Sequence, residues 1–289
     1  MSAPATRHAL AWGQRAAHAL AVPGRALAVF ERSFYVATPT GLACLGDIGG
    51  GPLNVVLDGA PPRLAIGDSV LREGPMLKVG RAFLVALASA ETWRPPPMPP
   101  WHAPRIRNGL AAIAALDVPR EGLAPLLASL AGAPRSGPLS DDLLLARARP
   151  ALARLSSWAR APNDDVSFLA PLAGLGPGLT PSGDDAVGGA MIAARAFGFV
   201  ADADAIAAAV AGWPAHATSA ISRAHLGAAA GGEGMAAFHE TLAAVGAGDG
   251  VRAAAACRAL GAIGHSSGWD ALAGAVGILT GLAERPAAA

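Results

Sequence analysis

Residues 174–185, with the sequence GLGPGLTPSGDD, combine a glycine-rich stretch, the start of a helix and two adjacent carboxylates. Thr180 is a good N-cap, and Pro181 suits the first helical position because the N–H that proline lacks would have no partner within the helix. The first amides of such a helix, together with its positive dipole end, attract an anion that the glycines allow to approach. Asp184 and Asp185 would repel a bare anion unless a divalent cation lies between them. The segment therefore predicts a site for a small anionic substrate with Mg²⁺ as the candidate ion.

Two carboxylates of this segment, Asp184 and Asp185, are the candidate metal ligands and catalytic acids. The candidate substrate-binding residues in the same segment are Gly176, Gly178, Thr180, Ser182 and Gly183. A plainer alternative is that the glycines form a tight turn and the aspartates only interact with the helix dipole. A Walker A loop is excluded, because its lysine follows the glycines and the only lysine of this chain is Lys78.

A second polar cluster lies at residues 216–225, where Thr218 and Ser222 are four residues apart and Ser219 is next to the first of them. This spacing places Thr218 and Ser222 on one helix face. Grouped hydroxyls can donate hydrogen bonds to an oxyanion, although Ser and Thr also bond back to their own helix. Thr218, Ser219 and Ser222 are therefore candidate substrate-binding residues.

A third cluster, residues 264–270, contains His265 followed by Ser266 and Ser267. Ser267 and Asp270 have the spacing of a capping box, which would account for both residues without a ligand. Capping does not account for His265, a candidate acid/base whose burial beside the helix start would favour its neutral form; an ordinary loop histidine is the alternative. Ser266 and Ser267 complete the candidate substrate-binding residues.

Composition and charge limit the classes of partner. At 289 residues and 53% hydrophobic side chains, the chain is long enough for two domains with a sizeable core. Its 22 basic and 21 acidic residues are nearly balanced, so no nucleic acid and no anionic membrane surface is expected as a partner. The N-terminal residues lack an apolar run of signal-peptide length, and the apolar segment 186–210 is interrupted by charges. We expect a cytoplasmic protein.

The order of patterns along the chain predicts an α+β protein. Short β-type segments alternate with glycine and proline turns from residue 26 to about residue 90, which indicates a small sheet or barrel. A proline-rich stretch follows at residues 94–100, and beyond residue 104 the apolar period changes to about 3.6. The expected organisation is a β-rich N-terminal domain at 1–93, a linker at 94–104 and a larger helical domain at 105–289.

Glycines recur behind the three polar helix starts, for example at Gly188, Gly189, Gly227 and Gly274. A glycine inside a helix is about 1 kcal/mol less favourable than alanine, so repeated use indicates close approach of helix backbones. We therefore expect the three helices to pack together and their N-terminal ends to converge on one pocket.

The three clusters together resemble a bacterial family that includes the AllH-type subunit of oxamate carbamoyltransferase. The segment 174–185 carries the most specific part of this resemblance, and residues 264–268 (GHSSG) carry a further part, while Trp269 departs from the small or polar residue expected there. The resemblance implies a role in allantoin (purine nitrogen) catabolism, where a carbamoyl group moves between oxamate and phosphate. It also implies other subunits of a hetero-oligomer as partners.

The functional expectation is therefore an AllH-like carbamoyltransferase subunit that binds a small anion at converging helix N-termini. In this hypothesis Thr180 and Ser182 hold the phosphate or carboxylate, Asp184 and Asp185 hold magnesium, and His265 handles the proton. Two alternatives remain open at this point. One is a non-catalytic metabolite-binding or assembly subunit, and the other is a magnesium-dependent protein that binds a nucleotide or phosphate.

Overall fold

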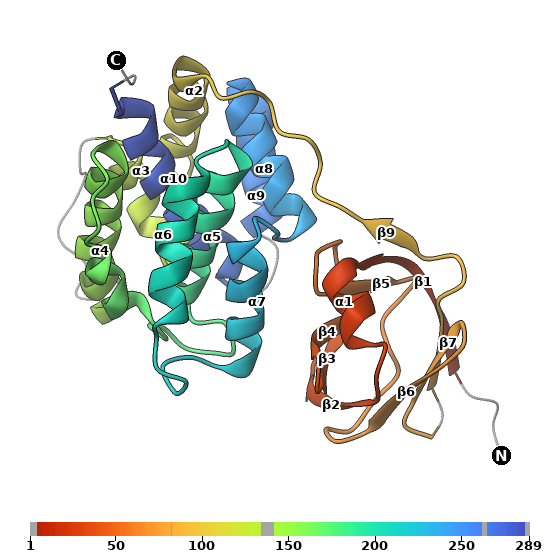
Figure 1. Cartoon of the computed structure of the whole chain (residues 1–289). Coiled ribbons are helices and arrows are strands. Elements are labelled where there is room, and N and C mark those ends of the chain that lie inside the picture. Colours follow the sequence, from red (N-terminus) through yellow and green to blue (C-terminus); the bar gives the residue numbers. More distant parts are fainter. Residues whose placement is uncertain (1–4, 82, 134–141, 262–264, 287–289) are drawn as a thin grey trace. The chain divides into compact units, whose positions relative to one another are not determined.

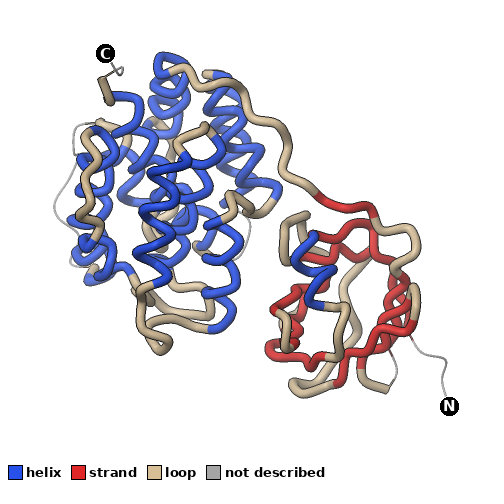
Figure 2. Tube along the Cα trace, viewed as in Figure 1, coloured by secondary structure: helices blue, strands red, loops and turns tan. Residues whose placement is uncertain are grey.

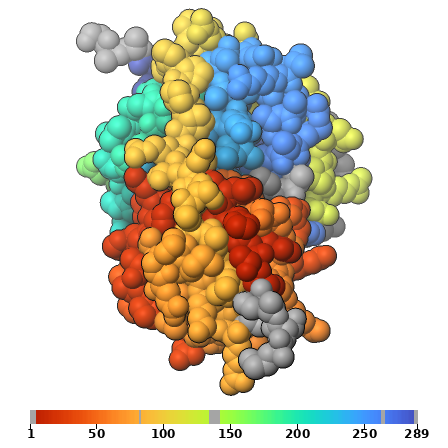
Figure 3. Space-filling model, turned by 90° about the vertical axis from the view of Figure 1, so that its right-hand side faces the viewer, coloured from red at the N-terminus to blue at the C-terminus, as the bar shows by residue number. Residues whose placement is uncertain are grey.

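The computed structural model describes residues 5–81, 83–133, 142–261 and 265–286. The chain forms two compact units, Met1–Pro95 and Pro96–Ala289 (Figures 1 and 2). The break between them lies in the proline-rich stretch, which has no regular structure and is mostly exposed to solvent (golden yellow in Figure 3). Regular structure resumes at Ala103, inside the segment expected to be linker, because the His102 ring accepts a hydrogen bond from the Arg105 amide and caps the helix there.

The first unit is a barrel of eight strands with one extra strand. Hydrogen bonding gives the order β5-β4-β3-β2-β6-β7-β8-β1, and pairing of β1 with β5 closes the ring. A ninth strand, β9, runs parallel to β1 outside the ring. The strands are β1 Ala5–Gly13, β2 Gly24–Val29, β3 Ser33–Thr38, β4 Gly41–Gly46, β5 Asn54–Leu57, β6 Ser69–Glu73, β7 Met76–Val79, β8 Phe83–Ala86 and β9 Glu91–Trp93.

Alternating side chains fill this barrel. Phe34 and Val36 on β3, with Phe83 and Val85 on β8, are buried, whereas the residues between them are only partly covered. The short helix α1 Gln14–Ala19 packs against β4. The predicted α+β class and β-rich N-terminal part are confirmed, and strand formation begins earlier than residue 26, at β1.

The second unit is helical. Its helices are α2 Ala103–Ala114, α3 Leu127–Leu130, α4 Leu143–Arg160, α5 Ser182–Ala196, α6 Val200–Ala211, α7 Ala220–Ala230, α8 Ala236–Ala247, α9 Gly250–Gly261 and α10 Ser267–Glu284, with short 3₁₀ turns η1 Ala124–Leu126 and η2 Ser167–Leu172. Helices α5 and α10 are buried on almost every face and form the centre of the unit. Within the described ranges, no helix has both the length and the hydrophobicity that crossing a bilayer requires.

Glycines allow α5 and α10 to touch through their backbones. A Cβ atom on Gly189 would lie 1.9 Å from the carbonyl oxygen of Ala271, and one on Gly274 would lie 1.7 Å from that of Ala186. The expected close packing is therefore confirmed for this pair of helices. Gly227 on α7 is an exception, since nothing lies within 4 Å of a Cβ built there.

Candidate functional site

Three polar helix starts, those of α5, α7 and α10, meet at one end of the second unit. Two glycines before α5 shape the loop that leads into it: Gly174 has φ +66° and Gly176 has φ +118°, in the region that glycine alone adopts readily. A Cβ on Gly174 would also lie 2.0 Å from the Ala217 carbonyl oxygen, just before α7. The loop is therefore folded against the segment that precedes α7.

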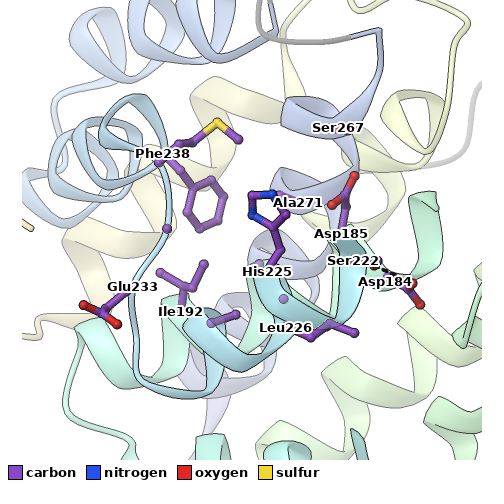
Figure 4. A pocket seen from close by; sticks show the side chains of 15 residues that line it. Asp184, Asp185, Ile192, Ser222, His225, Leu226, Glu233, Phe238, Ser267 and Ala271 are labelled. Atoms are coloured by element: carbon purple, nitrogen blue, oxygen red, sulfur yellow. Dashed lines mark hydrogen bonds between the residues drawn. The ribbon is translucent and has the colours of Figure 1, made fainter. Parts of the chain in front are cut away.

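Asp184 is the residue that ties these starts together, and it is 1% exposed. Its Oδ1 accepts a hydrogen bond from the Gly174 amide at 2.8 Å, and its Oδ2 accepts one from the Ser222 hydroxyl at 2.6 Å (dashed in Figure 4). The Thr218 hydroxyl donates to the same Oδ2. The grouped hydroxyls were predicted to bind the oxyanion of a ligand. Two of them instead donate to an anionic group of the protein itself, the Asp184 carboxylate.

Two details of the predicted helix starts are wrong. Helix α5 begins at Ser182 with Pro181 as its N-cap, and the Thr180 hydroxyl lies 3.0 Å from the Ser267 hydroxyl of α10 instead of capping α5. Pro181 itself has an extended backbone (ψ 142°), so the helix begins one residue later than predicted. Thr218 also precedes its helix, so it does not share a helix face with Ser222.

Ser219 is the true N-cap of α7. Its hydroxyl oxygen accepts a hydrogen bond from the Ser222 amide at 2.9 Å and donates one to the Leu179 carbonyl. Ser219 therefore stabilises both the helix start and the glycine-rich loop.

The predicted capping box of α10 is also wrong. Asp270 accepts hydrogen bonds from the Leu123 amide at 2.6 Å and from the Ser266 hydroxyl at 2.8 Å. Burial raises the pKa of the Asp270 carboxyl, and hydrogen bonds from Leu123, Ser266 and Ser182 partly oppose that rise. Asp270 thus fastens the segment before η1 to α10, and Ser267 is left to meet Thr180.

Asp185 differs from its neighbour Asp184. Burial raises its pKa well above the usual value, nearby Asp270 and Asp184 raise it further, and hydroxyls of Ser267 and Thr180 act in the opposite direction. Its Oδ2 is buried and has no hydrogen-bond partner among the residues that the structure describes. A buried polar atom without a partner costs free energy, which makes Asp185 the acid of this cluster best suited to meet a ligand.

Two glycines of the predicted site differ in how closely they are packed. The Gly183 amide donates to the Leu175 carbonyl at 2.8 Å, and a Cβ on Gly183 would lie 2.1 Å from the Leu172 carbonyl oxygen. Gly183 therefore packs α5 against η2. Gly178, with φ +89°, has open space around its Cβ position.

The two adjacent aspartates are unequal as candidate metal ligands. Asp184 uses both of its oxygens for hydrogen bonds, whereas Asp185 has an oxygen without one. In the part of the chain that the structure describes, no group of three or more His, Cys, Asp or Glu side chains is placed to hold a metal ion. Magnesium at Asp184 and Asp185 stays a prediction.

A pocket opens beside these residues, with a cavity volume of about 60 Å³ (Figure 4). Its polar side chains come from the three helix starts, from His225 in the middle of α7 and from Glu233 in the loop before α8. Its apolar wall comes from the middle of α5 and α7, from Ala271 of α10, and from Met235 and Phe238 at the start of α8. It is lined by Asp184, Asp185, Gly188, Gly189, Ile192, Ser222, His225, Leu226, Ala229, Glu233, Gly234, Met235, Phe238, Ser267 and Ala271. The expected convergence on one pocket is therefore observed.

His225 is a pocket residue that we did not predict. It follows Ser222 by three residues on α7, and residues at that spacing share a helix face. Burial lowers the pKa of its imidazole to about 4, so the ring is neutral at physiological pH. In the sequence, the spacing from Ser222 could have indicated that His225 belongs to the site. Nothing in the sequence around Phe238 indicated that it lines a pocket.

His265 lies in a different environment from the one predicted. Its side chain is 83% exposed, and its Nε2 is 3.8 Å from Glu121 Oε2. The expectation that it is buried beside the start of α10 is wrong, because this residue precedes the helix on the solvent side. Its role as an acid/base stays a prediction.

The comparisons with known proteins agree with the predicted resemblance. Residues 172–279 match the model of a family described as oxamate carbamoyltransferase subunit AllH, a segment that covers just over a third of the chain. The resemblance to that family is therefore confirmed for the region that runs from the end of η2 into α10. Searches of curated proteins and of solved structures found no match.

Proposed function

We propose that the chain is an AllH-like subunit of a carbamoyltransferase and that its pocket holds a small substrate of that enzyme. The observation that carries this proposal is that every residue lining the pocket lies between residues 172 and 279, the segment that matches the AllH family. The substrates would be oxamate and carbamoyl phosphate, in the breakdown of allantoin. The name of the family also supports other subunits of a hetero-oligomer as partners.

The size of the pocket favours a ligand of this kind. A volume of about 60 Å³ corresponds to roughly two water molecules at about 30 Å³ each, so it accommodates a group of a few non-hydrogen atoms such as one end of oxamate. A nucleotide is several times larger and would lie mostly outside. Within the described part of the chain, the lining also contains no lysine and no arginine, the usual partners of a polyphosphate. These features favour a small metabolite over the nucleotide-binding alternative.

The helix starts supply fixed polar groups near the reacting end of such a ligand. The α5 and α10 N-termini point their positive dipole ends toward the cluster that contains Ser182 and Ser267. Carbamoyl transfer develops negative charge on a carbonyl oxygen, and fixed donors stabilise that charge in the transition state. In this proposal Asp184 acts as a positioning residue, because its oxygens hold the loop and α7 in place.

A pair of glycine substitutions tests whether the ligand occupies the pocket. A Cβ on Gly188 would project into the pocket wall, 3.6 Å from Ala229 and 3.9 Å from Leu226, which are ordinary contacts. A Cβ on Gly227 would meet nothing within 4 Å. Both changes to alanine remove a helix glycine, so each should stabilise the protein, by up to about 1 kcal/mol.

Isothermal titration with oxamate and with carbamoyl phosphate supplies the measurement. We expect Gly188→Ala to lower the affinity at least tenfold while the melting temperature stays equal or rises, and Gly227→Ala to bind as the unchanged protein does. Equal affinities in the two variants would refute the placement of the ligand. Repeating the titration in MgCl₂ and in EDTA tests the magnesium prediction. If magnesium binds at Asp184 and Asp185, the ligand should bind more tightly in MgCl₂ than in EDTA.

The subunit role has its own test. The tagged full chain, purified from its native host, should carry other proteins of a carbamoyl-transferring complex in a fixed ratio. Turnover that depends on those partners supports a catalytic assembly. Ligand binding by a chain that purifies alone would instead favour the alternative of a metabolite-binding protein.

A further inference from the structure

His225 occupies a central place in the pocket. It projects from α7, and in Figure 4 its ring lies between Phe238 and Asp185. Leu226 and Ile192 add apolar surface to the same cavity. A ligand that enters the cavity therefore meets an imidazole with apolar side chains on one side and the Asp185 carboxylate on the other.

The charge of the cavity lining disfavours an anionic group at that position. Among the described residues, no lysine or arginine lines the pocket, while Asp184, Asp185 and Glu233 do. Burial keeps the His225 imidazole neutral at physiological pH, with a pKa of about 4. A carboxylate or phosphate placed beside the ring would lose its hydration without gaining a cation, which is unfavourable.

An uncharged amide group fits the same surroundings. A neutral imidazole carries one N–H donor and one acceptor nitrogen. A primary amide carries a carbonyl acceptor and N–H donors, so it complements the ring without requiring a change in its charge. The charged end of a small ligand would then lie away from the imidazole.

We propose that His225 binds the carbonyl oxygen of a carbamoyl or carboxamide group and so selects ligands that carry an amide over those that carry a carboxylate. This inference rests on the proposed function for the location of the ligand. It goes further by naming the group of the ligand that is recognised and the residue that recognises it. His225 is a specificity-determining residue in this arrangement.

Oxamate and oxalate provide a matched pair of probes, since they differ only in the replacement of the amide nitrogen by a carboxylate oxygen. With the full chain at neutral pH, calorimetry should give at least tenfold tighter binding of oxamate. His225→Phe keeps an aromatic ring without hydrogen-bonding groups and should lower oxamate affinity at least tenfold. His225→Gln retains a donor and should recover part of that loss.

His216→Gln is the control, because His216 is exposed and does not line the pocket; it should bind oxamate unchanged. If His225→Phe does not fold, His225→Leu replaces it in the comparison with His225→Gln. Equal affinities for oxamate and oxalate, or unchanged oxamate binding without the imidazole, would overturn the inference. If Gly188→Ala still lowers binding in that case, the proposed function survives; if no probe binds the unchanged protein, both proposals fail.

Discussion

Replacing Asp184 with alanine should destabilise the second unit strongly, because three donors lose one acceptor group. The Ser222 hydroxyl is buried and cannot turn to bulk water, whereas the Gly174 amide and the Thr218 hydroxyl are only half-buried and rehydrate in part. A buried donor left without a partner costs about 1–3 kcal/mol, and hydrogen bonds to a charged group are at the upper end, so the expected total is about 3–5 kcal/mol.

Asp184→Asn separates the loss of hydrogen bonds from the loss of charge. The asparagine carbonyl can accept from the Gly174 amide, and its amide can donate to the hydroxyls of Thr218 and Ser222, which can turn to accept. The expected loss is therefore about 1 kcal/mol, the part that comes from the charge. Asp164→Ala is the control, since Asp164 is exposed and should change stability by less than about 0.5 kcal/mol.

Urea unfolding followed by tryptophan fluorescence measures these differences, and hydrogen exchange at the Gly174 amide reports the specific contact. We expect exchange at this amide to accelerate in Asp184→Ala before global unfolding, and to stay slow in Asp184→Asn. A loss of less than 1 kcal/mol in Asp184→Ala, with the Gly174 amide still protected, would refute the view that this carboxylate holds the loop.

Three further changes have predictable directions. Burial raises the pKa of Asp185 in the folded protein, so the contribution of this residue to stability should decline as pH rises above about 4. Urea unfolding over pH should show this decline in the unchanged protein but not in Asp185→Asn, and the same pH dependence in both would contradict it. Arg285→Ala removes the partner of buried Asp202 (2.6 and 3.1 Å) and should cost about 3–5 kcal/mol by calorimetry; a cost below about 1 kcal/mol would contradict a desolvated ion pair. Gly189→Ala, which places a Cβ against an α10 carbonyl oxygen, should lower the melting temperature, whereas Gly227→Ala should not; similar melting points would count against tight packing of α5 on α10.

The sequence predicted the helix starts well because their indications are local. Proline, serine and aspartate at a helix start act within one turn, so the α5 start was placed to within one residue. The partners of these side chains are distant in sequence, and local rules assigned them wrongly. Thr180 was assigned to its own helix, although its hydroxyl meets Ser267, and Asp270 was assigned to Ser267, although it accepts from Leu123.

The elements that the sequence missed are those whose character depends on tertiary contacts. Strand β1 is rich in alanine, a helix former, and it becomes a strand by pairing with β5 and β8 around the buried Ala9. The apolar wall of the pocket has the same composition as an ordinary core. Phe238 and Ile192 are indistinguishable from core residues until the cavity beside them is seen.

Residues in and around the glycine-rich segment have two roles, since some support the fold and others line the pocket. This difference decides which variants can identify a ligand. Gly174, Gly183 and Asp184 hold the loop, η2 and α7 together through their own hydrogen bonds and close contacts. Losing ligand binding after a change at any of them would follow from a collapsed loop as readily as from a lost contact. Gly188 and His225 line the cavity and are not among the hydrogen-bond partners that hold Asp184, so substitutions there should change what the pocket accepts while leaving Asp184 and those partners in place.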